Sequence, residues 1–186
     1  MFPLQLTEKL TGMLNAGYAR KTPFTAANAV QFRRNAASFF QAAKDDRHSP
    51  IVRYANAYEA VHALAVGFIY IHGLAPGGGD GHRIKVIGTL LDHVKPDLDL
   101  DDRSEIEYAA RQRNEKIYES PAPPPSVKAV EDLIASVGNV KALIKQQWAS
   151  WYALKADKSY PLPRCSIMPA SASLPLTSPH LSLAIL

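Results

Sequence analysis

Residues 49–73 read SPIVRYANAYEAVHALAVGFIYIHG, and this stretch decides the fold class. Ser49-Pro50 is typical of a helix start, because proline at the first helical position sacrifices no backbone hydrogen bond. His72-Gly73 predicts the helix end, since glycine readily adopts the left-handed conformation that terminates a helix. Between these signals, large apolar residues recur at helical spacing and form one long stripe, which we predict to be the centre of the core. The stripe consists of Ile51, Tyr54, Tyr58, Val61, Ala65 and Phe68.

The segments that flank this helix also have helical periodicity. Thr25 and Ser126 are predicted N-caps, because their hydroxyls can accept a hydrogen bond from the first helical turn. Gly138-Asn139 is expected to kink or split the last helix. No segment alternates as a strand does, so the sequence predicts an all-α fold, an up-and-down bundle of about five or six helices with antiparallel neighbours. The flanking helices are expected to begin at Leu6, after Thr25, near His82, near Arg103 and after Ser126, and the first to end at Lys21-Thr22-Pro23.

Length and composition favour one domain followed by a tail. A chain of 186 residues can bury one substantial core. Residues 1–155 form the predicted helical domain, and residues 156–186 an irregular tail, because residues 165–186 contain no Asp, Glu, Lys or Arg and are rich in Pro, Ser and Leu. The single cysteine, Cys165, excludes a disulfide framework and a multi-cysteine metal site. The sequence predicts no metal and no cofactor.

The charge of the chain is unevenly distributed, with a net charge of +4 and a basic N-terminal third. Such a region could bind phosphates. However, no aromatic residues interleave with its cations, as they do on protein surfaces on which nucleic-acid bases stack. We therefore expect a solvated helix face, with phosphate binding as the alternative. The cations concerned are Arg33, Arg34, Lys44, Arg47 and Arg53.

Neither a membrane anchor nor a secretory signal is predicted. The longest apolar candidate, residues 60–75, contains two histidines and is too short to cross a bilayer. The N-terminal sequence MFPLQLTEKL lacks a basic stretch followed by an apolar one. We expect a cytoplasmic protein with no membrane contact.

A glycine-rich loop at residues 77–81 precedes the helix expected near His82. Backbone N–H groups at a helix start can hold an anion, and Arg83 and Lys85 add positive charge, so His82 and Arg83 are candidate phosphate contacts. The loop lacks the lysine and hydroxyl of a P-loop at the required spacing. The alternative is a flexible turn between helices, with His82 as a capping or packing residue rather than a general base.

Residues 108–121 read YAARQRNEKIYESP and contain the sharpest polar feature. Arg113 falls on the apolar face of the predicted helix, Asn114 lies beside it, and Tyr118 lies one turn beyond Asn114. A buried guanidinium or amide needs a partner, which another helix, a second subunit or a ligand can provide. A phosphodiester is a suitable ligand, because a guanidinium can hold two phosphate oxygens at once. The alternative is that Arg113 and Asn114 pair with acidic side chains and fasten the bundle. The apolar face consists of Ile106, Ala110 and Ile117.

Arg111 lies beside this motif and has a local explanation. Glu107 and Glu115 lie four residues on either side of it, a spacing at which ion pairs stabilise a helix by about 0.2–0.5 kcal/mol. Its position also makes it a candidate phosphate contact.

The sequence Arg113-Asn114-x-x-x-Tyr118 at the end of a late helix resembles the signature of HEPN domains, the "higher eukaryotes and prokaryotes nucleotide-binding" family. The order of the preceding elements is similar, namely a long Ala/Tyr-rich helix, a glycine-rich turn, and Gly81-His82-Arg83 opening a helix. The resemblance covers about residues 25–150. It implies an up-and-down bundle that dimerises, with the motif facing a cleft between subunits.

Many HEPN domains are metal-independent endoribonucleases, often toxins paired with a nucleotidyltransferase antitoxin. Their motif ends in a histidine, whereas this chain has Tyr118 in that place and no later histidine before His180. An unperturbed tyrosine titrates near 10 and is a poor proton carrier at neutral pH. The resemblance therefore supports the fold more than catalysis.

Two functions follow as hypotheses. The first is a HEPN-like, homodimeric RNA- or nucleotide-binding protein, either a metal-independent endoribonuclease or an inactive relative of one, with a nucleotidyltransferase-type antitoxin as partner. In it Arg113, Asn114 and Tyr118 form the catalytic motif, and Arg111, His82 and Arg83 contact phosphate. The second is a non-catalytic dimeric interaction module, in which Arg113 and Asn114 only tie helices together.

Overall fold

A computed structural model describes residues 2–78, 81–118 and 123–155, with residues 113–118 described by their backbone alone. This part of the chain is mostly helical, which confirms the predicted all-α bundle. The predicted tail, residues 156–186, lies outside the described residues. Within the described part, no helix combines the length and apolar character needed to cross a membrane.

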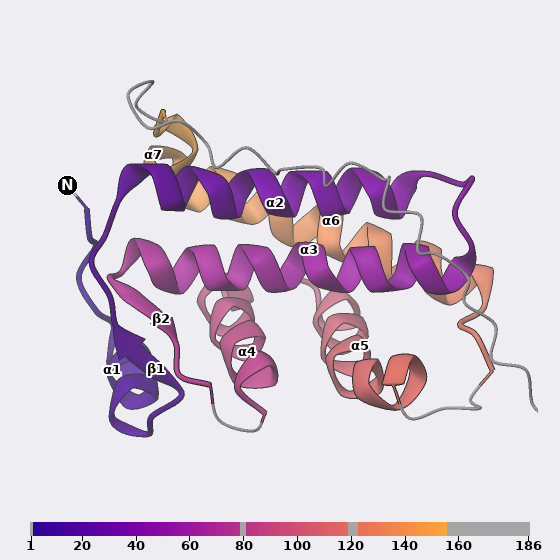
Figure 1. Cartoon of the computed structure of the whole chain (residues 1–186), viewed down its shortest axis with the longest axis horizontal. Coiled ribbons are helices and arrows are strands. Elements are labelled where there is room, and N and C mark those ends of the chain that lie inside the picture. The colour runs from indigo at the N-terminus through magenta and orange to yellow at the C-terminus, as the bar shows by residue number, and fades with distance from the viewer. Residues whose placement is uncertain (1, 79–80, 119–122, 156–186) are drawn as a thin grey trace, which may run out of the picture.

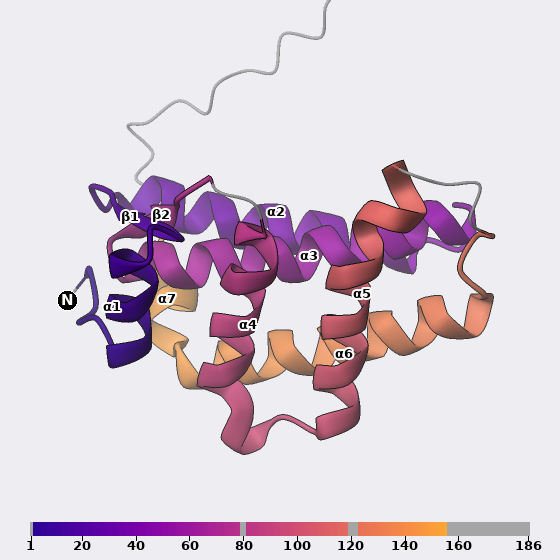
Figure 2. The same cartoon turned by 90° about the horizontal axis from the view of Figure 1, so that it is seen from below.

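Three long helices run side by side along the molecule: α2 (Ala26–Lys44), α3 (Pro50–Ile71) and α6 (Val127–Gln147) (Figure 1). Two further helices, α4 (His82–Val94) and α5 (Leu100–Tyr118), cross α3 steeply and lie side by side as an antiparallel pair (Figure 2). The fold thus has a layer of long helices with a helical hairpin set across it.

Helix α3 forms the centre of the core, as its sequence predicts. Tyr54, Tyr58, Val61, Ala65 and Phe68, five of the six residues of the predicted stripe, are almost completely buried. The helix begins after Ser49, with Pro50 in the first turn, and ends at Ile71, with His72 as its C-cap before Gly73 at φ +76°.

Glycine allows a close helix contact on this layer. A Cβ built on Gly67 of α3 would lie only 2.5 Å from the ring of Trp151. Trp151 belongs to the short helix α7 (Ala149–Ala153), is fully buried, and its indole Nε1 donates to the backbone oxygen of Ala29 at 2.9 Å. The absent side chain at Gly67 therefore makes room for the indole that fastens α7 to the layer.

The predicted caps are present, but one predicted break is in a different place. Thr25 accepts a hydrogen bond from the N–H of Asn28, and Ser126 from that of Ala129. Helix α6 runs without interruption through Gly138-Asn139, so the helix is not split there. The interruption comes at Trp148, whose backbone leaves the helical region and separates α6 from α7.

A small antiparallel sheet was not predicted. Strands β1 (Ala19–Lys21) and β2 (Leu74–Pro76) pair with Arg20 opposite Ala75. Helix α1 (Glu8–Asn15) therefore ends well before the predicted stop at Lys21-Thr22-Pro23. Strands of three residues are too short for an alternating pattern to be recognised.

Two of the N-terminal arginines bind within the protein rather than facing solvent. Arg33 donates to the backbone oxygens of Trp151 at 2.8 Å and Leu154 at 3.2 Å, and so satisfies the C-terminal carbonyls of α7. Arg53 donates to the backbone oxygen of Ala43 at 2.9 Å and pairs with Glu131 at 2.6 Å. The prediction of a solvated face is wrong for these two arginines, because tertiary packing brings helix ends onto them.

Candidate functional site

The predicted motif lies at the end of α5, which remains helical to Tyr118. Ile106, Ala109 and Ala110 are buried, so the predicted apolar face is confirmed in the described part of the helix. Position 113 follows Ala110 by three residues and therefore lies on the same face of the helix backbone. The side chains of Arg113, Asn114 and Tyr118 lie outside the described residues, and their roles stay predictions.

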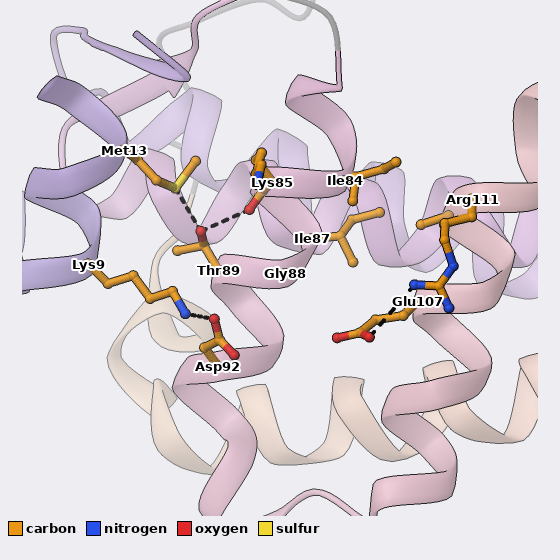
Figure 3. Close-up of a pocket in the computed structure, with 11 residues that line it drawn as sticks. Lys9, Met13, Ile84, Lys85, Ile87, Gly88, Thr89, Asp92, Glu107 and Arg111 are labelled. Carbon is orange, nitrogen blue, oxygen red and sulfur yellow. Dashed lines mark hydrogen bonds and ion pairs between the residues drawn. The ribbon is translucent and has the colours of Figure 1, made fainter. Parts of the chain in front are cut away.

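A cavity of about 370 Å³ lies between α1, α4 and α5, next to the turn of α5 that carries Arg111 (Figure 3). Its apolar wall is formed by side chains from all three helices, and Gly88 and Thr89 complete the wall on α4. Ionic side chains surround this wall. The apolar residues are Met13, Ile84, Ile87 and Ala110, and the ionic ones are Lys9, Lys85, Asp92, Glu107 and Arg111.

Four of the five ionic side chains at the cavity, all except Lys85, are joined through Arg103 in one network of ion pairs. Asp92 pairs with Lys9 of α1 and, through its other oxygen, with Arg103 of α5 at 2.8 Å. Glu107 accepts from Arg103 at 2.8 Å and lies 4.0 Å from the guanidinium of Arg111. Both carboxylates are thus shared between two cations.

The network and the cavity lining together carry an excess of positive charge. Lys9, Lys85, Arg103 and Arg111 face two carboxylates, which leaves two uncompensated positive charges among the described side chains. Although Lys9 pairs with Asp92, its pKa lies below the ordinary value, because of desolvation first and of the neighbouring cations Arg103 and Lys95 second. A crowded group of cations of this kind favours an anion.

Arg111 is the most accessible cation of the network. Its side chain is 59% exposed, and its ion pair to Glu107 is long. Lys85 is also exposed, with its ammonium group 5.7 Å from the centroid of the Tyr18 ring. Both cations stand at the cavity, and among the described side chains neither has a short ion pair that a ligand would have to break.

Helix α1 is held against α4 by polar contacts at its start. The Thr7 hydroxyl lies 3.0 Å from Nε2 of His93, and it also caps α1 by accepting from the N–H of Leu10. Lys9, the second residue of α1, pairs with Asp92 of α4. These contacts keep the α1 side of the cavity in place.

The other predicted phosphate contacts lie apart from the cavity lining. His82 is the first residue of α4, after Gly81 at φ +70°. Arg83 pairs with Glu59 of α3 at 2.9 Å. Hydrogen bonding from His62, together with Arg83, lowers the pKa of Glu59 to about 2. The structure therefore brings Arg111 and Lys85 to the cavity and engages Arg83 within the bundle.

Part of this site could not be found from the sequence. Lys9, Asp92 and Arg103 come from distant parts of the chain and meet only because the α4–α5 hairpin packs beside α1. The pairing of Glu107 with Arg111 was predicted, since it depends on helical spacing alone. Within the described ranges, no three His, Cys, Asp or Glu side chains cluster as metal ligands do.

Comparison of the chain with protein-family models, with curated proteins and with solved structures gave no significant match. The HEPN resemblance therefore rests on the short motif and the order of elements.

Proposed function

We propose that this protein binds RNA or a nucleotide at the face formed by α4 and α5. Arg111 and Lys85 hold phosphates at the edge of the cavity, and the predicted motif residue Arg113 adds a further contact from the end of α5. The observation that carries this proposal is the excess of cations around the cavity, with Arg111 left accessible.

Phosphate is the anion that fits these side chains best. A guanidinium offers a planar fork of N–H donors that matches two phosphate oxygens, and a lysine adds a mobile point charge. Arg111 and Lys85 come from two different helices and lie on opposite sides of Ile84 and Ile87, so they can contact two phosphates of one chain (Figure 3). Backbone contacts of this kind dominate the affinity of proteins for nucleic acids.

Binding is proposed here without cleavage. Proton transfer at neutral pH needs a group that titrates near 7, most often a histidine. None of the described residues that line the cavity is a histidine, and the motif has Tyr118 in the place of the usual one. The predicted homodimer, antitoxin partner and cytoplasmic location agree with an RNA-binding role and stay predictions.

The test is fluorescence anisotropy of a labelled single-stranded RNA with the full chain, in the presence of a chelator. Arg111→Ala should weaken binding about 10- to 150-fold, since a charge-assisted hydrogen bond contributes about 1.5–3 kcal/mol. Arg113→Ala should act in the same direction. Arg47→Ala is the matched control, because Arg47 is 85% exposed and pairs with Asp45 in the turn between α2 and α3. Wild-type protein that fails to bind RNA or nucleotide, or an Arg111→Ala variant that binds equally well, would overturn the proposal.

A further inference from the structure

Gly88 is a helix-interior glycine that the fold itself does not require. Glycine in this position costs about 1 kcal/mol relative to alanine. A close contact or a positive φ usually explains such a glycine, but a Cβ built on Gly88 would meet no atom within 4 Å, and its φ is not positive. Gly67 is the opposite case, because the space that its side chain would fill is occupied by the Trp151 ring.

The missing side chain of Gly88 leaves the α4 wall of the cavity open. Ile84, one turn earlier, is 42% exposed at the cavity, and Ile87 forms the buried part of the same wall. The Thr89 hydroxyl donates to the backbone oxygen of Lys85 at 2.9 Å, and so lies against the helix. The result is a concave apolar surface close to the helix backbone, edged by Lys85 and, across the cavity, by Arg111.

We infer that this cavity takes the base of one unpaired nucleotide, which lies over Gly88 against Ile84 while Arg111 and Lys85 hold the phosphates on either side of it. This inference rests on the proposed function and names its ligand as single-stranded RNA. A base is flat and has apolar faces, so it fits a shallow apolar wall where a side chain would stand in its way. A volume of about 370 Å³ lies within the usual range of small-ligand sites.

Base pairing decides which nucleic acids can bind in this way. A duplex keeps its bases stacked and paired inside, whereas unpaired bases of loops and single strands can turn outward into a protein site. The apolar wall and the cations border the same cavity, so it can take a base together with the phosphate attached to it through its sugar. Single-stranded RNA therefore binds more tightly than a duplex or a bare sugar–phosphate chain.

The test measures the anisotropy of three labelled ligands with the full chain: a single-stranded RNA, its duplex, and an oligomer of equal length without bases. The wild-type protein should bind the single strand at least about 10-fold more tightly than the baseless oligomer, as expected for one base contact. Gly88→Leu, which fills the cavity, should lose this preference and bind both at the weaker level. Gly12→Leu is the matched control, because a Cβ on Gly12 of α1 also meets no atom within 4 Å and Gly12 does not line this cavity.

The outcomes separate the inference from the function on which it rests. Equal wild-type affinity for the single strand and the baseless oligomer overturns the base site, and this arm needs no variant. An unchanged preference in folded Gly88→Leu overturns it as well, while a loss in Arg111→Ala would still support phosphate binding. No wild-type binding to any of the three ligands overturns both.

Discussion

The two sides of α3 use the same residue types in opposite ways. On the side of α2 and α7, Arg33 is bound to backbone carbonyls and the space at Gly67 is filled by the Trp151 ring. On the side of the α4–α5 hairpin, Arg111 is largely exposed and the space at Gly88 is empty. An arginine and a glycine serve the fold in the first region and are available to a ligand in the second.

The largest effect is expected where the first region is packed most tightly. Trp151→Ala removes a fully buried indole and its hydrogen bond to Ala29, and should lower the free energy of unfolding by about 3–5 kcal/mol. Urea denaturation followed by circular dichroism measures this loss. A change below about 1 kcal/mol would show that α7 is not part of the cooperative fold.

The two glycines give the sharpest contrast between the regions. Gly67→Ala forces a Cβ against the Trp151 ring and should destabilise the protein by about 1–3 kcal/mol. Gly88→Ala meets no atom and should stabilise it by about 0.5–1 kcal/mol, because alanine favours the helix. Thermal melts of both variants decide, and a loss of stability in Gly88→Ala would contradict the assignment of this glycine to a ligand site.

Arginines provide the next comparison. Arg33→Ala leaves the carbonyls at the end of α7 without their donor and should cost about 1–3 kcal/mol. Arg47→Ala removes an exposed pair with Asp45 and should change stability by less than about 0.5 kcal/mol. Denaturation midpoints of the two variants measure the difference, which vanishes if Arg33 is merely a surface charge.

The contact between α3 and α4 should weaken at low pH. The pKa of Glu59 is lowered to about 2 in the folded protein, first by hydrogen bonding from His62 and then by Arg83 of α4. Because the folded pKa lies below the ordinary value of 4.5, this contribution is complete above that pH and is lost as the pH falls toward 2. The Glu59→Gln variant should therefore lose less stability than the wild type between pH 5 and 2.5. Denaturation midpoints of both proteins measured across this pH range test this. If the denaturation midpoints of the two proteins changed equally with pH, Glu59 would contribute nothing to the pH dependence of stability.

The fold could be predicted from the sequence where local signals decide it. Helix α3 has a proline at its start, a glycine after its end and one unbroken stripe between them, so its bounds and its burial were predicted. The break at Trp148 has no glycine or proline to announce it, and the paired strands are too short to show a pattern. The role of Arg33 depends on α7, more than a hundred residues away in the chain.

The candidate site, like the fold, was predictable only in part. Arg111 was recognised from its place on α5, and Lys85 from the charges that follow the glycine loop. Lys9, Asp92 and Arg103 gave no signal, because only the packing of three helices side by side brings them together. A functional role for Gly88 was not predicted, since a lone glycine in a helix becomes informative only when its surroundings are known to be empty.

The central claim, that Arg111 contacts a phosphate, is tested most directly by the salt dependence of RNA binding. Each phosphate contact with a single strand contributes about 0.7 to the slope of log Kd against log salt concentration. The slope measured for Arg111→Ala should therefore be about 0.7 smaller than that of the wild type, while Arg47→Ala leaves it unchanged. Equal slopes for wild type and Arg111→Ala would contradict the account, whatever the affinities at a single salt concentration.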